Sequence, residues 1–424
     1  MLMNNKYSKK LFYLFAVMAM TMPSTANAQK YVGGDISNLT ANEKKSPTYY
    51  DNSGNKVSDP MDMFKAEQLN AMRVRIHVNP SDYPNNDPNV CQDLEYVKTL
   101  GKRIKDEGFK LMLDFHYSDT WADPAKQWTP KAWENLSDEQ LYTKIYEYTK
   151  AVLTQMKNAG AEPDFIQTGN EISYGMLWGK EGSSNLKKCY SNNTANWNRF
   201  TTLLTKAGKA CREVCPQAKI ILHNERTHKP SELTYFFNTM KTANVDYDII
   251  GLSYYPIWHS TLSDLESSLN TLETTYPDKD IMIVETGAAY SWLPDKRDYT
   301  PSYEKSEAGQ KKFTDDLITM LNKHKKVTGL FWWWMDYNAY PCATTKMEGW
   351  WYAPLFDSNT GKALEAMSSL KNFLDGSSSV GGIKADAGND NGQWYTIGGQ
   401  PAGEHPSKAG LYVKKGKKTI VHRQ

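Results

Sequence analysis

The chain has 424 residues, of which 40% are hydrophobic and 23% charged, and its formal net charge is +2. This globular composition excludes a disordered, collagen-like or coiled-coil protein, and the balanced charge gives no indication of nucleic acid as a partner. Aromatic residues make up 12% of the chain, with 13 Trp and 26 Tyr. Rings beyond the needs of a core indicate stacking surfaces, for which sugars are one common ligand.

Residues 1–28 have the pattern of a secretory signal peptide. Three lysines precede a mostly apolar stretch at 11–22, and Ala26-Asn27-Ala28 is a small-residue cleavage site. An uncleaved membrane anchor is the alternative, but the apolar stretch is too short to span a bilayer comfortably. The segment has no acidic residue, so its removal changes the net charge from +2 to −1. We expect an exported protein without a membrane span in the mature chain, located in the periplasm, at the cell surface or outside the cell.

Between residues 31 and 375, short apolar runs alternate with amphipathic segments. Strands are predicted at 32–37, 72–78, 110–116, 164–168, 219–223, 248–254, 280–285 and 327–333. Helices are predicted at 60–70, 94–104, 137–159, 197–215, 232–242, 262–276, 306–324 and 362–374. Eight strand-helix units predict an α/β protein with a (β/α)8 TIM barrel as catalytic domain over 29–375. A doubly wound open sheet is the alternative, but no GxGxxG turn follows the first strand.

The C-terminal part differs in composition. Residues 376–393 begin GSSSVGG and predict a flexible linker. Residues 394–424 predict a small β segment with short strands at 394–399 and 410–413. This tail resembles the β appendage at the C-termini of many exported proteins of Bacteroidetes-type bacteria. Sorting or surface attachment and a solvated extension both remain open as its role.

The cysteine and histidine patterns give no support for a metal or cofactor. The five cysteines are odd in number and sparse, which favours a packed core over a disulfide scaffold; they are Cys91, Cys189, Cys211, Cys215 and Cys342. The sequence contains no H-E-x-x-H, C-x-x-C or P-loop motif. We therefore expect no cofactor and no metal in the site.

Two predicted strands end in a carboxylate at the rim where a TIM barrel carries its catalytic groups. Glu171 follows the fourth strand, and Glu285 ends the seventh. These strands face each other across an eight-stranded barrel, so the two carboxyl groups can flank one bond. Glycosidic cleavage needs such a pair, one group protonated beside the leaving oxygen and one ionised beside the anomeric carbon. A salt bridge at the rim is the alternative.

Polar residues on neighbouring strands favour the catalytic interpretation. Period two places Arg73, Arg75, His77 and Asn79 on one face of the second strand, toward the barrel mouth. A guanidinium there would keep Glu285 ionised, although a buried structural ion-pair network is the alternative, particularly for Arg75.

Three further strands bring polar and aromatic groups to the same rim. The third strand carries Asp114, His116 and Ser118, and the sixth carries Ser253 and Tyr255, whose hydroxyl can donate to the carboxylate of Glu285. The eighth carries Trp332, Trp333 and Trp334. We expect Trp333 to form the floor under the reacting sugar and at least one of the three to pack in the core.

With these residues, the sequence resembles the endo-β-1,4-galactanases of glycoside hydrolase family 53. The run DFHYSDTWADPAKQW at 114–128 is the most specific match. Shorter matches, in the expected order, are GDIS at 34–37, RVR at 73–75, VNP at 78–80, GNE at 169–171, GLSYYP at 251–256, VET at 284–286 and GLFWW at 329–333.

The resemblance implies a (β/α)8 barrel that hydrolyses β-1,4-galactan, the side chain of pectin, by retaining double displacement. It implies that Glu171 is the acid/base, Glu285 the nucleophile, and Asn170 the partner of the reacting sugar's 2-hydroxyl. Arg73 matches the arginine beside the nucleophile. His116 and Trp333 match residues lining the cleft, and the loop that shapes the substrate groove holds Asp119, Trp121 and Trp128.

The full set of expected substrate-binding residues is Arg73, Asp114, His116, Asp119, Trp121, Asn170, Ser253, Tyr255 and Trp333. Retention requires carboxyl groups about 5–5.5 Å apart. Glu171 should titrate above an ordinary carboxyl, because it stays protonated beside an ionised Glu285.

The sequence also departs from the family pattern. The family usually has Trp where His77 stands and Glu where Trp334 stands. Some bacterial members bind a structural calcium in the loop after strand seven, but residues 294–299 read PDKRDY, and the basic pair argues against that site.

We expect a monomer that acts on a polysaccharide. Another β-glycanase of the same clan, acting on mannan or glucan, is one alternative, although the Arg73 and 114–128 stretches favour galactan. A non-catalytic glycan-binding barrel is the other, although it would have no need of both glutamates.

Overall fold

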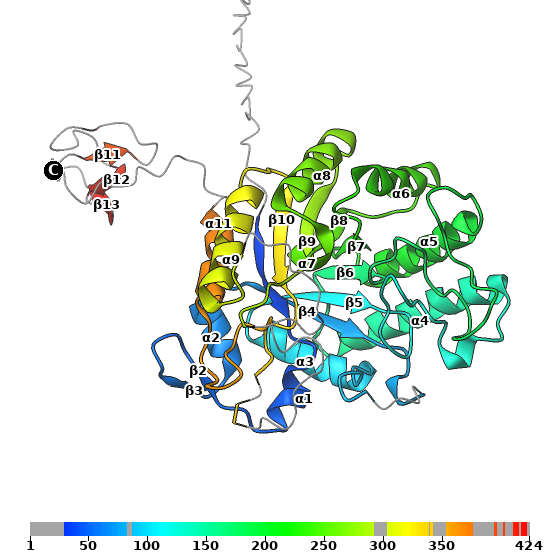
Figure 1. Cartoon of the computed structure of the whole chain (residues 1–424), viewed down its shortest axis with the longest axis horizontal. Helices are drawn as coiled ribbons and strands as arrows, with labels where there is room; N and C mark the ends of the chain where they lie inside the picture. Colours follow the sequence, from blue (N-terminus) through cyan, green and yellow to red (C-terminus); the bar gives the residue numbers. More distant parts are fainter. Residues whose placement is uncertain are drawn as a thin grey trace, which may run out of the picture.

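The computed structural model describes residues 29–82, 87–291, 303–338, 340–341 and 353–375, together with 394–396, 402, 410–414 and 417–421 near the C-terminus. At its centre, eight parallel strands form a closed barrel in the order β1-β10-β9-β8-β7-β6-β5-β4 (Figure 1). These strands are β1 (Tyr31–Asp35), β4 (Ala71–Ile76), β5 (Lys110–Phe115), β6 (Phe165–Thr168), β7 (Lys219–Asn224), β8 (Ile249–Tyr254), β9 (Asp280–Thr286) and β10 (Val327–Trp332). The predicted (β/α)8 barrel is therefore confirmed.

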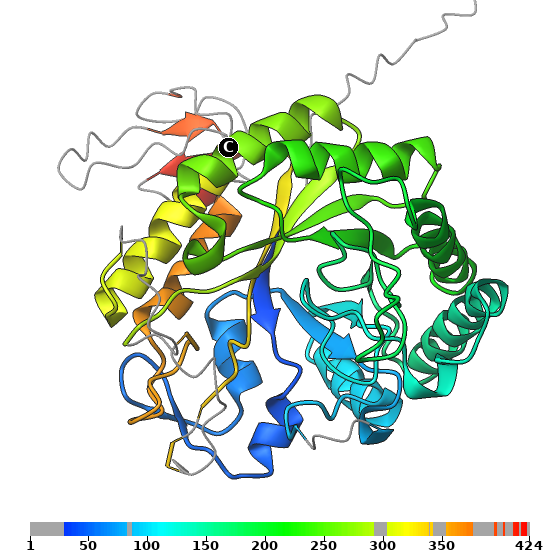
Figure 2. The ribbon, with the colours of Figure 1, turned by 45° about the vertical axis from the view of Figure 1, so that its right-hand side comes forward.

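Helices surround the barrel as an outer ring (Figure 2). They are α2 (Pro60–Ala66), α3 (Leu94–Asp106), α4 (Asp138–Asn158), α5 (Trp197–Val214), α6 (Pro230–Thr242), α8 (Leu262–Thr275), α9 (Glu307–Leu321), α10 (Glu365–Ser369) and α11 (Asn372–Asp375). In the described part of the chain, none of the helices combines the length and the hydropathy of a transmembrane segment.

The helix α3 illustrates how the sequence forms this ring. The Asp93 carboxylate accepts a hydrogen bond from the backbone N–H of Tyr96 and thereby caps the first turn. Val97, Leu100 and Ile104 recur three or four residues apart, and all three are buried. This spacing places them on one face of the helix, which packs against the barrel.

The barrel interior changes from apolar to polar toward the carboxyl ends of the strands. The lower layer is a cluster of buried apolar side chains: Ala71, Met112, Phe165, Ile221, Ile249, Met282, Val284 and Phe331. Two residues further along four of these strands, the inward positions hold the buried polar groups Arg73, Asp114, Gln167 and His223, and buried Ser253 lies four residues beyond Ile249 on β8. The apolar layer closes the barrel below, so the polar mouth is where a ligand can bind.

The predicted helix at 362–374 is replaced by the two short helices α10 and α11. Lys362 and Ala363 are not helical because they form β-bridges with Tyr50 and Phe356. The pairing with Tyr50 joins segments far apart in the sequence, so the local amphipathic pattern could not indicate it.

Several small elements were not predicted. In the loops around the barrel they are α1 (Leu39–Glu43), the hairpin of β2 (Tyr49–Tyr50) and β3 (Lys56–Val57), η1 (Pro80–Asp82), η2 (Lys131–Trp133) and α7 (Pro256–His259). In the tail, β11 (Tyr395–Thr396), β12 (Gly410–Lys414) and β13 (Lys417–Val421) form an antiparallel three-stranded sheet, of which β13 was not predicted. The predicted signal peptide at 1–28 and linker at 376–393 lie outside the described residues.

Candidate active site

A cleft of about 780 Å³ opens at the carboxyl ends of the barrel strands. Glu171 and Glu285 both line it, as the rim positions predict. The remaining lining includes aromatic, acidic and basic side chains from several loops: His116, Trp121, Asn170, Glu225, Arg226, Tyr255, Trp258, Trp333 and Trp334. Such a mixture of ring faces and polar groups suits a polyhydroxylated ligand.

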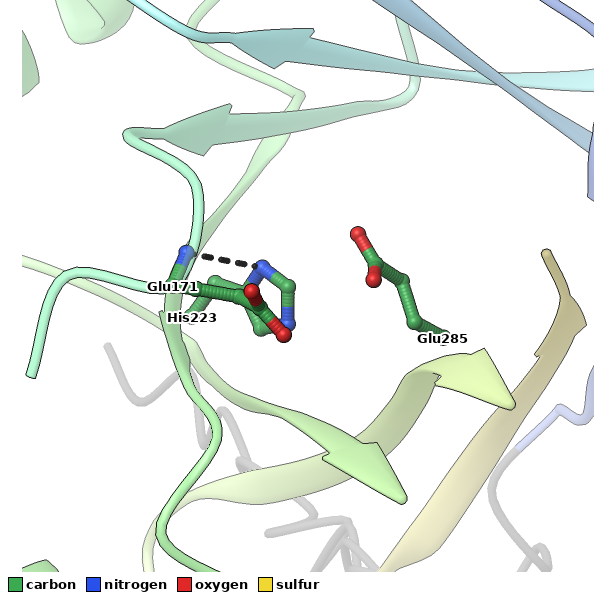
Figure 3. Close-up of side chains that lie close together, drawn as sticks. All are labelled: Glu171, His223 and Glu285. Atoms are coloured by element: carbon green, nitrogen blue, oxygen red, sulfur yellow. Dashed lines mark hydrogen bonds between the residues drawn. The ribbon is translucent and has the colours of Figure 1, made fainter. Parts of the chain in front are cut away.

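The two glutamates face each other across the cleft, with His223 beside Glu171 (Figure 3). One carboxylate oxygen of Glu171 lies within 4.8 Å of one of Glu285. This proximity fits the separation of about 5–5.5 Å between carboxyl groups that a double displacement requires, and it leaves too little room for an attacking water between them.

Glu171 has a strained backbone, with a φ of 46° in the left-handed region. Its backbone N–H donates to Nδ1 of His223 over 3.2 Å, and this contact holds the strained turn in place. Because Nδ1 of His223 accepts that hydrogen bond, the proton of the neutral ring is on Nε2. Burial lowers the pKa of His223 well below its ordinary value, so the ring stays neutral.

A short chain of hydrogen bonds connects His223 to the carboxylate of Glu171. Nε2 of His223 donates to the Ser253 hydroxyl over 2.7 Å, and that hydroxyl donates to Oε1 of Glu171 over 2.6 Å. The chain fixes one oxygen of Glu171 and leaves the other free to face a ligand. Burial and the negative charge of Glu285 raise the pKa of Glu171 well above that of an ordinary carboxyl.

Glu285 is held from two sides. Nη2 of Arg73 lies 2.8 Å from Oε1, and the Tyr255 hydroxyl donates to Oε2 over 3.0 Å. Burial raises the pKa of Glu285 to about 7, while Arg73 and Tyr255 lower it. Glu285 has a guanidinium and a hydroxyl donor that favour its charge, whereas burial and the charge of Glu285 disfavour a charge on Glu171, so the proton of the pair belongs on Glu171.

Arg73 also organises the residues behind the pair. Its guanidinium donates to Asp35, to Asp114 and to Oδ1 of Asn170 over 2.8–3.1 Å. Nδ2 of Asn170 donates to the Ala122 carbonyl over 2.8 Å, so the orientation of this amide is fixed before a ligand binds. The cleft is therefore preorganised.

Besides Arg73, which is fully buried and reaches the cleft through the carboxylate of Glu285, three of the expected substrate-binding residues lie behind the cleft wall and do not line it. Asp114 is fully buried and binds Arg73 and Gln167. Ser253 is fully buried and reaches the cleft through Glu171. The Asp119 carboxylate accepts from the backbone N–H groups at positions 79 and 131, which ties two loops together.

The other expected residues, namely Arg73, His116, Trp121, Asn170, Tyr255 and Trp333, line the cleft or contact its carboxylates. His116 is held by the Ala122 N–H, which donates to Nδ1 over 2.9 Å. Trp128, placed in the groove by the resemblance, instead packs edge-on against Trp178 at 5.9 Å.

The three consecutive tryptophans at the end of β10 divide between core and cleft. Trp332 is fully buried, as expected for at least one of them, and its indole N–H donates to the Ala353 carbonyl. Trp333 and Trp334 line the cleft beside Trp121. The guanidinium of Arg75 lies 4.3 Å from the Trp121 ring centre, so this arginine supports the aromatic wall while it pairs with buried Asp35.

Sequence reasoning missed the contribution of β7. His223 orients Glu171, and Glu225 and Arg226 line the cleft. The signal was present, because His223-Asn224-Glu225 is a polar run at the end of a predicted strand, as is Gly169-Asn170-Glu171. This run did not lead to a prediction because none of its residue types is specific for one kind of site.

Glu171, His223 and Glu285 are also the one group in the described part of the chain with the donor atoms for a metal ion. Both nitrogens of His223 are engaged in hydrogen bonds with Glu171 and Ser253, so the ring would have to give up one of these bonds to bind an ion. The loop at 294–299, discussed above for calcium, lies outside the described residues.

An eight-stranded barrel with two carboxyl groups within 4.8 Å of each other in an aromatic cleft is the arrangement of a retaining glycoside hydrolase. The sequence model of Glycosyl hydrolase family 53 matches residues 31–370. The chain therefore belongs to this family.

Individual relatives agree with this assignment. An endo-beta-1,4-galactanase of Bacillus subtilis is 33% identical over 311 residues, which cover 71% of this chain and 68% of the relative. An arabinogalactan endo-beta-1,4-galactanase of Cellvibrio japonicus is 32% identical over 372 residues, covering 82% and 93% of the two chains. The solved GH53 catalytic domain of Ignisphaera aggregans superposes with a TM-score of 0.71 at 33% identity, covering 81% of this chain and 96% of that one.

Proposed function

We propose that the protein is an endo-acting retaining β-1,4-galactanase that cleaves galactan, or type I arabinogalactan, of pectin. The observation that carries the proposal is the carboxylate pair, with oxygens of Glu171 and Glu285 within 4.8 Å and with Arg73 and Tyr255 bound to Glu285. Family membership and galactanases among the relatives support the choice of galactan.

The geometry supports a two-step mechanism. The ionised Glu285 attacks C1 of the bound galactosyl unit while Glu171 gives its proton to the departing glycosidic oxygen. The products are a galactosyl ester on Glu285 and a shortened chain with a free hydroxyl. Glu171, now ionised, takes a proton from water, whose oxygen attacks C1 and releases Glu285. We propose that Asn170 binds the 2-hydroxyl and that Trp333 forms the floor under this sugar.

Product analysis tests this function. The full chain is incubated with linear β-1,4-galactan, galactomannan and cellulose, and the products are sized. We expect galactobiose to galactotetraose from galactan and no products from the other two polymers. Preferential cleavage of galactomannan or cellulose would show that the protein is a mannanase or glucanase of the same clan. Binding of galactan without any cleavage would show that it is a non-catalytic glycan-binding barrel.

We also propose that the protein is exported and acts as a monomer without a cofactor or a metal. The apolar segment at 11–22 with the cleavage pattern ending at Ala28 supports export. N-terminal sequencing of the protein from the cell envelope or medium should begin at Gln29, and light scattering should give the mass of one chain. Because we expect no metal to be required, the protein should keep its full activity after treatment with a chelator.

A further inference from the structure

The cleft contains a third acidic side chain that the catalytic pair does not use. Glu225 follows β7, is only 5% exposed and lines the cleft. Its Oε1 accepts a 2.5 Å hydrogen bond from the Ser173 hydroxyl and lies 3.1 Å from Nε of Arg226. Its Oε2 is buried and has no hydrogen-bond partner in the described part of the chain. A buried carboxylate oxygen without a partner is costly, and a ligand hydroxyl that reaches it from the cleft would remove that cost.

An exposed tryptophan lies on the loop after the neighbouring strand. Trp258 belongs to α7, which follows β8, and 40% of its surface is exposed although it lines the cleft. Its ring packs edge-on against Tyr255 at 5.2 Å, and Tyr255 in turn binds Glu285. An indole fixed at its edge with an exposed surface is a platform on which the apolar face of a sugar ring can stack.

The barrel order places these two residues on the leaving-group side of the cleft. Glu171, which protonates the leaving oxygen in the proposed mechanism, is held by His223 of β7 and Ser253 of β8. The loops after these same adjacent strands carry Glu225 and Trp258.

The opposite side of the cleft is built differently. Trp121, Trp333 and Trp334 surround the arginines of β4, on the side of the nucleophile. The sugar attacked at C1 therefore lies toward these tryptophans, and the sugar that departs lies toward Glu225 and Trp258.

We propose that Glu225 and Trp258 form the binding subsite for the leaving galactosyl unit, with Oε2 of Glu225 accepting a hydroxyl of that sugar and Trp258 stacking against its ring. This inference rests on the proposed galactanase function. Such a subsite would favour a sugar over an aryl leaving group, because the sugar has a hydroxyl that can donate to Oε2.

The substitution Glu225→Gln tests the role of the carboxylate. The Ser173 hydroxyl keeps the amide oxygen at the Oε1 position, so an NH2 group replaces the acceptor Oε2. The full-length variant is assayed on β-1,4-galactan and on an aryl β-galactobioside, whose leaving group has no hydroxyl for Oε2. We expect kcat/KM to fall by about ten- to one-hundred-fold on galactan, the range for a hydrogen bond to a charged group, and to stay unchanged on the aryl substrate.

Glu232→Gln is the matched control. Glu232 lies on α6, contacts the same Arg226 at 3.5 Å and does not line the cleft, so its loss should change neither activity. Trp258→Ala gives a second, independent reading, because its exposed side chain tolerates truncation. We expect this variant to lose activity on galactan and to transfer galactosyl units to galactobiose less often than wild type.

An equal loss of kcat/KM on both substrates would show that Glu225 acts through Glu171 and not on the leaving sugar, which would overturn the subsite. A shift of the alkaline limb of the pH profile without a loss of activity on galactan would lead to the same conclusion. Wild-type activity of both variants on galactan would overturn it as well. Failure of the wild-type enzyme on both substrates would instead overturn the galactanase function itself. Thermal unfolding of each variant identifies any loss that arises from misfolding.

Discussion

Nη2 of Arg73 lies 2.8 Å from Oε1 of Glu285 and also 2.8 Å from Oδ2 of Asp114, and all three side chains are buried. The carboxylates raise the pKa of Arg73 still further, so the guanidinium is charged throughout the working pH range. It offsets the burial that raises the pKa of Glu285 to about 7. The nucleophile therefore depends on one arginine for its ionised form.

Replacing this arginine should change both the pH profile and the stability. In Arg73→Met the pKa of Glu285 rises, so the acid limb of kcat/KM against pH moves to higher pH. The variant also leaves Asp114 buried without its arginine and Asp35 with Arg75 alone, which should cost about 3–5 kcal/mol of unfolding free energy. Arg73→Lys, which keeps a charge, should show smaller effects in the same directions. An unchanged acid limb in a folded Arg73→Met protein would refute this role.

The two catalytic glutamates should separate by their dependence on the leaving group. Glu171→Gln should lower activity on galactan by about 10²–10⁴-fold, the typical contribution of general acid catalysis. Its first step on a dinitrophenyl galactoside should be nearly normal, because that leaving group needs no proton. Glu285→Gln should abolish both reactions. Exposed Glu139 on α4 provides the control substitution Glu139→Gln, which should leave both unchanged.

The barrel itself was predictable because its signals are local and repeated. Each strand is a short apolar run, each long helix is amphipathic, and eight repeats define the closure. The catalytic pair was predictable for the same reason, since Glu171 and Glu285 stand at strand ends. The family resemblance added their roles.

Depth within the barrel mouth was not predictable from periodicity. Period two places Asp114 and His116 on the same face of β5, yet Asp114 is sealed behind Arg73 while His116 lines the cleft. Whether a residue two positions further along lines the cleft depends on the side chains that neighbouring strands place in the barrel mouth. Asp119 presents a similar case, because its backbone partners at positions 79 and 131 come from separate loops.

The hydroxyl of Ser253 should tune the acid/base group. It donates to Oε1 of Glu171 and thereby favours the ionised form, which lowers the pKa of that carboxyl. In Ser253→Ala the pKa of Glu171 rises, so the alkaline limb of the pH profile should move to higher pH. We also expect kcat to fall by about tenfold, since Glu171 loses a fixed orientation.

Ser268→Ala is the control for this substitution. Ser268 is equally buried, but its hydroxyl donates to the Thr227 carbonyl away from the carboxylates. It should lower stability without shifting the profile. A Ser253→Ala enzyme whose alkaline limb coincides with that of wild type would contradict the assignment.

Asp336 is a buried acid outside the cleft lining that should limit stability at neutral pH. It is fully buried, and Nδ2 of Asn42 donates to its Oδ2 over 3.2 Å. Burial and the negative charge of Asp35 raise its pKa well above the ordinary value. A carboxyl with a raised pKa in the folded state stabilises below the pKa of the unfolded chain, about 3.9, and this contribution is lost as pH rises toward the folded pKa.

Asp336→Asn should therefore stabilise the protein, because the amide keeps an oxygen for Asn42 and never ionises. The gain over wild type should grow with pH by about 1.4 kcal/mol per unit between the two pKa values. Urea unfolding of variant and wild type at several pH values between about 4 and 8 measures this difference in unfolding free energy. Exposed Asp62 on α2 gives the control Asp62→Asn, which removes a carboxylate from the surface and not from the core. A stability difference for Asp336→Asn that stays constant with pH would mean that Asp336 is ionised in the folded protein.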